Sequence, residues 1–383
     1  MEKFLLLFKF YLLKFLATAG NRKEKKKYLF LIRIDHLGDF LITLPLFSQL
    51  KEYASRENRL LAIALAPALK ELAEKTGYFD KIIIGDESSW KKRLLFYREC
   101  AKLHHPLVVN FHIFGRSLFN DYAALFPSPE KSFLFDTRKT IPKKFPYMEL
   151  ARKYINDRYT HLIPYDPELS LIENEARLAS CVTGKKISPA IGDLSLFQLP
   201  PSRAARKPYY IIVPGANSPT RRYPAEKFAF LIDGIQKRFP FLTPVISGTE
   251  GEKPVAGKVL DLCQSSPQIL DLTGRTTLRE LFANIRDCEF LISNDTSAIH
   301  IAAKFQKRTF CFSGSWHGIG YAPPPELHRN FTRFALHCDS ELCFFCTKKE
   351  SGPYPCLADF SEKEALETIL EILEKEPFAA GRC

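Results

Sequence analysis

The sequence predicts an α/β protein of two domains, each with a parallel sheet and helices on both faces. Strand-like apolar runs alternate with helix-like runs through both halves of the chain, which is typical of that arrangement. The length of 383 residues suits two domains of ordinary size. The composition, 46% hydrophobic and 26% charged, is that of a soluble globular protein.

The residues 1–27 are both apolar and basic. They contain eight Lys or Arg and two Glu, a net charge of +6 out of +12 for the whole chain. The Phe- and Leu-rich run at 4–16 is too short to span a membrane, and Lys9 and Lys14 break the apolar core that a signal peptide requires. We interpret 1–27 as an arm whose helix lies on an anionic membrane surface. The alternative is an N-terminal helix packed on the body of the protein.

Strands are expected where short apolar runs are bounded by turn residues. In the first half of the chain they lie at Tyr28–Ile34, Leu60–Leu65, Lys81–Ile84 and Leu107–Ile113. In the second half they lie at Tyr209–Val213, Thr243–Ser247, Gln268–Leu272, Cys288–Ile292 and Arg308–Phe312. Residues 200–208 are rich in proline and basic residues, so we expect them to link a domain at 28–199 to one at 209–360.

The stretch from Tyr28 to Pro45 leads from a strand through a turn into a helix. Gly38 lies in the turn, where a glycine permits close approach of the backbone, and Asp39 follows it. In open α/β sheets, ligands bind in the crevice outside the carboxyl ends of the strands. Asp39 is thus placed for chemistry, although an aspartate that merely caps the helix would have the same sequence pattern.

A second strand-to-loop-to-helix stretch runs from Tyr209 to Pro224. It contains Gly215 in a loop of small residues, then Arg221 and Arg222 just before Pro224, which suits the first position of a helix. Two arginines at this place could bind a diphosphate through paired hydrogen bonds. They could equally be solvated charges of a surface loop.

The stretch from Ser293 to His300 follows a further strand and opens a helix. Asp295, Thr296 and Ser297 are small polar residues at the start of that helix, where unpaired backbone N–H groups favour an anionic phosphate. The alternative is an ordinary helix cap. His300, in the first turn, either reaches the same pocket or packs as a neutral side chain.

Nine of the ten cysteines fall into two groups. Five are scattered, several of them in expected core strands, which fits a reducing cytoplasm: Cys100, Cys181, Cys263, Cys288 and Cys311. The spacing Cys-x4-Cys-x2-Cys-x9-Cys is formed by Cys338, Cys343, Cys346 and Cys356. Four thiolates this close could hold a structural zinc ion, although the spacing is not that of a standard zinc module. Free thiols or a disulfide are the alternatives.

A final helix is expected at 361–376. Ser361 and Glu364 have the spacing of a capping box. An apolar stripe follows at Leu366, Ile369, Leu370 and Leu373. We expect this helix to cross back to the first domain.

Four stretches, in this order, resemble glycosyltransferase family 9, the heptosyltransferases of lipopolysaccharide core assembly. The chain has IRIDHLGD at 32–39, PGANSPTRRYP at 214–224, DLTG at 271–274 and NDTSAIHIAA at 294–303. The resemblance implies the GT-B fold, two Rossmann-like doubly wound domains facing each other across a cleft. It also implies an inverting transfer, with heptose moving from ADP-heptose onto a lipopolysaccharide core-type acceptor. The expected location is the cytoplasm, on the inner face of the cytoplasmic membrane.

The resemblance also implies a role for the first motif. Asp39 matches the motif aspartate and would act as the general base that takes a proton from the acceptor hydroxyl, with Gly38 beside it on the acceptor side. A helix N-terminus lowers the pKa of a carboxylate and weakens it as a base, whereas desolvation raises the pKa.

On the donor side, Arg221 aligns with a lysine of the family pattern and lies next to Arg222. Backbone and hydroxyl groups of Thr296 and Ser297 would supply further donors to the diphosphate. The remaining donor-binding residues expected are Gly215, Asp295, which would accept hydrogen bonds from the sugar or orient the loop, His300, and Glu250 or Glu252 for the ribose. No metal cofactor is expected, because arginine and helix amides can carry the charge and no Asp-x-Asp motif is present.

Three positions depart from the family pattern. Ser297 stands where the family has Gly, Arg221 replaces Lys and Tyr223 replaces Trp. A related transferase that uses another nucleotide sugar for an O-antigen or capsule-like glycan therefore stays open, as does a non-catalytic relative that binds a nucleotide sugar. A nucleic-acid-binding module is disfavoured, because half of the net charge lies in 1–27 and no such motif occurs. No Gly-x-Gly-x-x-Gly follows an expected strand, which disfavours a nicotinamide-dependent oxidoreductase.

Overall fold

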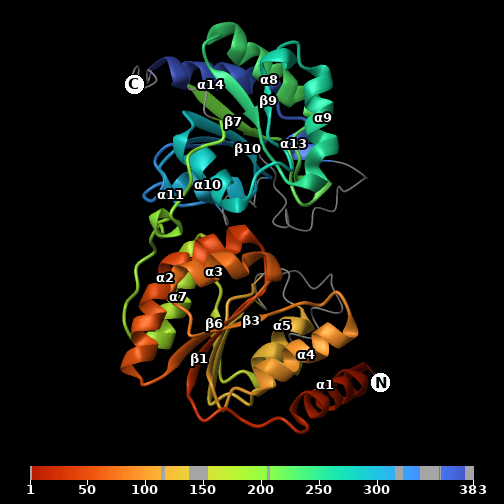
Figure 1. The fold of residues 1–383 in the computed structure, drawn as a ribbon, viewed down its shortest axis with the longest axis vertical. Coiled ribbons are helices and arrows are strands. Elements are labelled where there is room, and N and C mark those ends of the chain that lie inside the picture. Colours follow the sequence, from red (N-terminus) through yellow and green to blue (C-terminus); the bar gives the residue numbers. More distant parts are fainter. Residues whose placement is uncertain are drawn as a thin grey trace. The chain divides into compact units, whose positions relative to one another are not determined.

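The chain folds into two compact units, Met1–Gly192 and Asp193–Cys383. The computed structural model describes residues 2–113, 117–137, 154–204, 208–314, 322–336, 353 and 355–375 (Figure 1). The stretch 200–208, expected to be a linker, belongs to the second unit. There Ser202 Oγ and the Arg203 N–H both donate to Asn284 Oδ1, each at 2.9 Å. The boundary between the units therefore precedes the expected linker.

The first unit contains a six-stranded parallel sheet in the order β3-β2-β1-β4-β5-β6. Its strands are β1 (Tyr28–Arg33), β2 (Leu60–Leu65), β3 (Lys81–Ile84), β4 (Leu107–Asn110), β5 (Lys131–Asp136) and β6 (His161–Pro164). Four of these were expected, and β5 and β6 were not. All pairs are parallel, for example Phe30 opposite both Ala62 and Val108.

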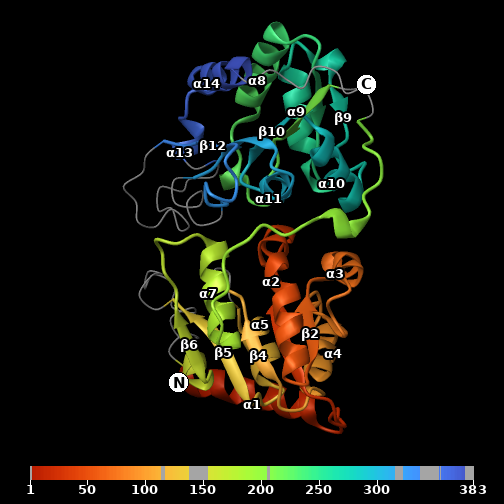
Figure 2. The same cartoon turned by 90° about the vertical axis from the view of Figure 1, so that its left-hand side faces the viewer.

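Helices cover both faces of this sheet. On one face α2 (Leu37–Arg56) and α7 (Leu171–Thr183) pack side by side, and the opposite face carries α4 (Trp90–Ala101) and α5 (Leu118–Leu125) (Figure 2). The short α3 (Lys70–Thr76) precedes β3. The core between the sheet and α4 and α5 is strongly aromatic, because Phe96, Tyr97 and Phe126 pack there against β1.

The N-terminal helix α1 (Glu2–Thr18) packs on the body of the first unit. Phe10 and Ala17 are buried, and the Phe10 ring meets those of Tyr122 and Phe126 edge-on, with centroids at 5.2 and 5.4 Å. A second face stays exposed, with Phe15 67% accessible. The alternative that the N-terminal helix packs on the body of the protein therefore holds for one face of α1 only. In the part of the chain described here, no helix combines the length and apolarity needed to cross a bilayer.

The second unit repeats the design with the sheet order β12-β11-β10-β7-β8-β9, again all parallel. Its strands are β7 (Tyr209–Val213), β8 (Thr243–Ile246), β9 (Leu270–Asp271), β10 (Phe290–Asn294), β11 (Arg308–Phe312) and β12 (Phe331–Phe334). Its helices are α8 (Ala225–Arg238), α9 (Lys253–Leu262), α10 (Leu278–Asp287), α11 (Ser297–Lys304), α13 (Pro355–Ala358) and α14 (Glu362–Lys375). Two doubly wound α/β sheets confirm the expected fold class.

The C-terminal helix α14 packs on α8 within the second unit. Ala365, Ile369 and Leu373 are buried in the core that also contains Phe228. The contact is close because α8 has a glycine, Gly234, where any Cβ would overlap the Leu366 side chain. The expectation that this helix crosses back to the first domain is therefore corrected: its apolar stripe is buried against α8.

The order of the strands fixes where each sheet can bind a ligand. In the first sheet, successive strands are added on one side of β1 as far as β3 and on its other side from β4 onward, so the strand order switches between β1 and β4. In the second sheet the corresponding switch lies between β7 and β10. At such switch points the loops after neighbouring strands diverge and leave a crevice at the carboxyl edge. Asp39 follows β1, and the loops that contain Arg221 and Asp295 follow β7 and β10. The candidate residues from all three stretches thus follow strands that border a switch point.

Candidate active site

Asp39 lies in the first turn of α2, immediately after the switch-point strand β1. Its carboxylate Oδ2 accepts a hydrogen bond from the backbone N–H of His36 at 3.3 Å. The N-cap of α2 is therefore His36, and Asp39 is the third residue of the helix in a capping box. The side chain is 17% exposed. Gly38 precedes it in the same turn and is half-buried. Asp39 is thus partly accessible and receives a single long hydrogen bond in the described part of the chain.

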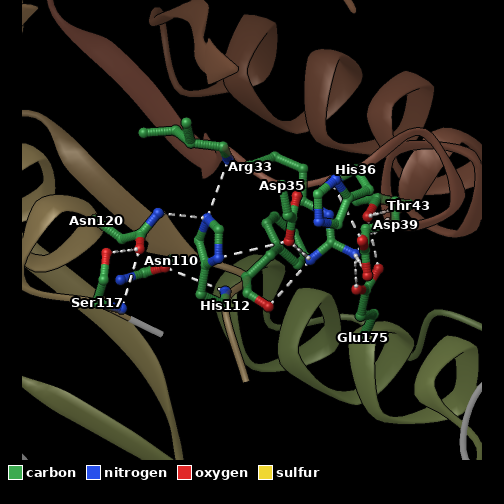
Figure 3. Close-up of polar contacts among 12 residues, drawn as sticks. Arg33, Asp35, His36, Asp39, Thr43, Asn110, His112, Ser117, Asn120 and Glu175 are labelled. Carbon is green, nitrogen blue, oxygen red and sulfur yellow. Dashed lines mark hydrogen bonds and ion pairs between the residues drawn. The ribbon is translucent and has the colours of Figure 1, made fainter. Parts of the chain in front are cut away.

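Arg33, at the end of β1, is the centre of the charges around Asp39 (Figure 3). The side chain is buried, and its guanidinium contacts three carboxylates. The N–O distances are 2.8 Å to Glu175, 3.3 Å to Asp35 and 3.7 Å to Asp39. It also donates to the backbone carbonyls of Phe111 at 3.1 Å and Asp39 at 3.0 Å. One positive charge is therefore shared by three acidic side chains.

This sharing affects the proton affinity of each carboxylate. Burial raises the pKa of Asp39, and the neighbouring Asp35 raises it further, against the opposite effects of Arg33 and His36. Burial likewise raises the pKa of Asp35. Burial raises the pKa of Glu175 to about 7, although Arg33 acts in the opposite direction. Desolvation thus outweighs the helix N-terminus at Asp39 and favours its use as a base.

A histidine with a defined tautomer lies behind Asp35. His112 is buried, and its Nε2 accepts from the Ile34 N–H at 3.0 Å and from the Asn120 amide at 2.8 Å. The Asn120 amide orientation is set by the Ser117 N–H, which donates to Asn120 Oδ1 at 3.1 Å. Because Nε2 accepts, the proton of a neutral ring is on Nδ1, which faces Asp35 Oδ2 at 3.5 Å. Figure 3 shows this chain of contacts running to Asp35.

Four of these residues were not singled out from the sequence. Arg33 and Asp35 lie within the first motif, where alternate charges after a strand could have marked them. His112 closely follows β4, the other strand at the switch point, which was a usable signal. Glu175 is a buried carboxylate within amphipathic α7, and no local pattern connects it to Arg33.

In the second unit, the two adjacent arginines have different environments. Arg222 donates from both Nε and Nη2 to the Ala216 carbonyl, at 3.0 and 2.8 Å, and so braces the loop after β7. The half-buried Arg221 side chain makes no hydrogen bond or ion pair with the residues that the structure describes. Only Arg221 therefore keeps its guanidinium available for a ligand.

Asn294, the last residue of β10, ties the donor-side loops together. Its amide donates to the carbonyls of Pro214 at 2.8 Å and Gly215 at 3.3 Å, and its Oδ1 accepts from the Tyr223 N–H at 2.8 Å. Tyr223 is fully buried and stacks on Phe312 with ring centroids 3.9 Å apart. The replacement of Trp by Tyr223 is thus a change in core packing.

The start of α11 has the geometry of a capped helix. Thr296 is the N-cap, and its hydroxyl accepts from the Ala298 N–H at 3.2 Å. Ser297 is the first residue of the helix and is half-buried, whereas Asp295 is buried. His300 is also buried, which lowers its pKa to about 3, so it is neutral at physiological pH. Burial and a neutral ring agree with a packed side chain, and they leave a role of His300 in the pocket as a prediction.

The two glutamates after β8 face different partners. Glu250 forms an ion pair with Lys253 at 2.7 Å and is 71% exposed. Glu252 accepts from the Thr249 N–H at 2.7 Å through Oε2, and its other oxygen lies over Gly215, where a Cβ would overlap it. Gly215 thus allows the Glu252 carboxylate to approach the loop after β7. Glu252 is better placed beside that loop than Glu250.

Most of the cysteine cluster lies outside the described residues. This applies to Cys338, Cys343 and Cys346, whereas Cys356 is half-buried at the core of the second unit. Among the residues that the structure describes, no group of His, Cys, Asp or Glu side chains is arranged to hold a metal ion.

Comparison with known proteins connects these features to a family. The family model described as glycosyltransferase family 9 (heptosyltransferase) matches residues 129–315. No curated protein matches the sequence. The solved structures most similar to this fold have low sequence identity, and so what they share with it is the fold.

Three of these structures cover almost the whole chain. A glycosyltransferase family 9 protein from Veillonella parvula has 18% identity and a TM-score of 0.66, covering 93% of this chain and 100% of that one. The ADP-heptose LPS heptosyltransferase II of E. coli has 15% identity and a TM-score of 0.62, covering 91% and 99%. The E. coli heptosyltransferase WaaC, solved with ADP, has 13% identity and a TM-score of 0.62, covering 91% and 100%. The fold is thus that of the GT-B heptosyltransferases. Together with the family model over residues 129–315 and the four motifs, it supports a glycosyltransferase that is similar to family 9 (heptosyltransferase).

Proposed function

We propose that this glycosyltransferase moves heptose from ADP-heptose onto a lipopolysaccharide core-type acceptor, with inversion at the anomeric carbon and Asp39 as the general base. The observation that carries the proposal is the state of Asp39. Its carboxylate follows a switch-point strand, is partly accessible, and has a pKa raised by burial and by Asp35. A carboxylate of this kind holds an abstracted proton better than an ordinary surface aspartate does.

In the proposed reaction, the acceptor hydroxyl attacks the anomeric carbon from the face opposite the diphosphate. The bond between that carbon and the diphosphate oxygen breaks, the nucleoside diphosphate leaves with the electron pair, and the hydroxyl proton passes to Asp39. The base must be ionised when substrate binds. Arg33 at 3.7 Å favours the ionised form without donating a hydrogen bond that would weaken the base.

Negative charge develops on the departing diphosphate, and fixed donors there lower the barrier. Arg221 suits this role because its guanidinium is uncommitted within the described structure, while Arg222 holds the loop in place. Backbone amides at Thr296 and Ser297 would add further donors. Neutral His300 could contribute only a hydrogen bond. The arrangement requires no metal cofactor.

The nucleoside would lie beside Glu252, whose carboxylate oxygen over Gly215 can accept hydrogen bonds from ribose hydroxyls. Asp295 would bind sugar hydroxyls of the donor or orient its loop. A transferase with another nucleotide sugar is the second candidate. Ser297 in place of glycine favours it, because the added side chain changes the contact surface at the start of α11.

A lipid-linked acceptor fits the exposed face of α1. Five apolar side chains recur there at helical spacing and are each at least 40% exposed: Phe8, Tyr11, Leu12, Phe15 and Leu16. Lys9 on the same helix and the exposed basic residues at 22–27 add positive charge beside this stripe. Such a surface binds anionic bilayers through apolar insertion and attraction to headgroups. We therefore place the enzyme at the cytoplasmic face of the inner membrane.

The test is calorimetric binding of ADP, GDP, UDP and CDP to the full-length protein, followed by turnover of the matching nucleotide sugar. Selective binding of ADP supports the heptose donor, and selective binding of another nucleotide replaces the donor. Asp39→Asn should bind the nucleotide normally and lose roughly 100-fold or more in turnover. Retained turnover in that variant would overturn the assignment of the base. If no nucleotide binds, the protein is not a transferase of this kind.

A further inference from the structure

The Arg33 guanidinium is divided unequally between Glu175 and Asp39. The same nitrogen, Nη2, lies 2.8 Å from Glu175 Oε1 and 3.7 Å from Asp39 Oδ1. The shorter distance is that of a close ion pair, and the longer one is beyond hydrogen-bond distance. Nη2 also donates to the Asp39 carbonyl at 3.0 Å. The guanidinium is therefore near Asp39, but the carboxylate closest to it is that of Glu175.

Glu175 is held in place by α2, the helix that contains Asp39. The Glu175 side chain is fully buried, and its Oε2 accepts from the Thr43 hydroxyl at 2.8 Å. Thr43 lies one turn after Asp39 (Figure 3). The carboxylate thus reaches from α7 between Thr43 and Arg33, and its position depends on the packing of α2 against α7.

We propose that Glu175 is a positioning residue for the transfer reaction: it holds Arg33 out of hydrogen-bond distance of Asp39 and so preserves Asp39 as a proton acceptor. The proposal rests on the function proposed above for Asp39. Without the Glu175 charge, the buried guanidinium would turn to the nearest remaining carboxylates, Asp35 and Asp39. A hydrogen bond from Arg33 would stabilise ionised Asp39 and make it a weaker base.

The ionisation of Glu175 makes this effect depend on pH. Burial raises the pKa of Glu175 to about 7, with Asp35 and Asp39 acting in the same direction and Arg33 and Thr43 opposing them. His36 faces Asp39, and His112 faces Asp35. Above the pKa, ionised Glu175 attracts Arg33. Below it, protonated Glu175 loses that attraction, and the enzyme should resemble a variant with a neutral side chain at this position.

The experiment measures kcat and the donor KM of the full-length enzyme from about pH 5.5 to about pH 9, as wild type and as Glu175→Gln. A one-ångström approach of Arg33 to Asp39 is worth about one pK unit at an effective dielectric of ~20. We therefore expect kcat of the variant to fall roughly threefold to tenfold at the alkaline end. The two enzymes should converge below pH ~6, and the donor KM should change less than about twofold.

Thr43→Val provides a second variant that keeps the carboxylate. Removing the hydroxyl donor raises the pKa of Glu175, so the step in kcat should move to higher pH, and Thr43→Ser should restore it. The matched control is Glu173→Gln on the same helix, because Glu173 contacts the Ser170 cap and not Arg33. It should leave the pH profile unchanged.

The outcomes separate this proposal from the function on which it rests. If Asp39→Asn is inactive but the ratio of wild type to Glu175→Gln stays constant with pH, the positioning role is wrong and the base is unaffected. If Asp39→Asn remains active, the proposed base is wrong whatever Glu175 does. Should Glu175→Gln fail to fold, an unshifted step in Thr43→Val would reject the proposal.

Discussion

Arg222 and Ala216 are joined by two hydrogen bonds, because Nε and Nη2 of the arginine both donate to the same carbonyl oxygen. This relationship distinguishes two neighbouring arginines that look equivalent in the sequence. Arg222 has a structural task in the loop after β7. Arg221 remains available within the described structure.

The two arginines should therefore respond differently to removal. Arg221→Ala should weaken ADP binding roughly tenfold to 100-fold, because a charge-assisted contact to the diphosphate is lost, with no change in thermal midpoint. Arg222→Ala should lower the free energy of unfolding by about 1–2 kcal/mol, because the Ala216 carbonyl loses its donors. Calorimetric titration and thermal denaturation of both variants check this. Equal loss of affinity with unchanged stability in both would contradict the distinction.

Glu252 and Glu250 form a second matched pair. Glu252→Ala should weaken binding of ADP but not of inorganic diphosphate, because the carboxylate over Gly215 is expected to contact the ribose. The expected loss is roughly tenfold, the size of a hydrogen bond to a charged group. Glu250→Ala should have little effect, since its exposed ion pair with Lys253 contributes little. A larger effect at Glu250 would reverse the assignment.

Two phenylalanines on α1 test the exposed face against the packed one. Phe10→Ala should lower the free energy of unfolding by about 3 kcal/mol, because Phe10 is 2% exposed in an aromatic core. Phe15→Glu should leave stability almost unchanged, because Phe15 is 67% exposed. It should reduce binding to vesicles of phosphatidylglycerol and phosphatidylethanolamine roughly tenfold, as measured by co-sedimentation. Unaltered vesicle binding would reject the membrane surface.

His300 should make stability depend on pH in a defined direction. Burial lowers its pKa from 6.5 to about 3, so the unfolded chain binds a proton between these values and the folded protein does not. The stabilisation is complete above the unfolded pKa and is lost as the pH falls, by about 2 kcal/mol at pH ~5. Urea denaturation should show a shallower decline below pH ~6.5 in His300→Gln. His104→Gln, at an exposed position, should behave as wild type.

Patterning in the sequence was sufficient for most of the fold. Strands such as β2, β3, β7 and β11 were placed at their observed residues because they are short, largely apolar runs. The strand β6 (His161–Pro164) was missed, since its residues are only partly buried or exposed and lack an apolar signature. The C-terminal helix was recognised, but its partner was wrong, because an apolar stripe does not specify which surface buries it.

For the candidate site, local motifs placed Asp39, Arg221 and Ser297 beside the switch points. They could not identify Glu175, whose partner Arg33 is 142 positions away in the sequence. Nor could they tell Arg221 from Arg222, because that difference depends on which guanidinium faces the Ala216 carbonyl. Contacts between distant segments decide both cases.

The packing of α1 affects how far from a bound membrane the acceptor hydroxyl would have to lie. Phe10 and Ala17 fix this helix in the core of the first unit. A lipid surface that bound the exposed face of α1 would therefore hold the first unit in one orientation, whereas a flexible linker would leave its orientation free. The end of α1 and the segment that leads from it to β1 contact the end of α4: Arg98 donates to the Leu16 carbonyl, and the Glu24 N–H donates to the Lys102 carbonyl. Asp39 follows the far end of that six-residue strand, roughly 20 Å away. The hydroxyl to be glycosylated would then have to stand well above the lipid, on the outer sugars of an extended glycan.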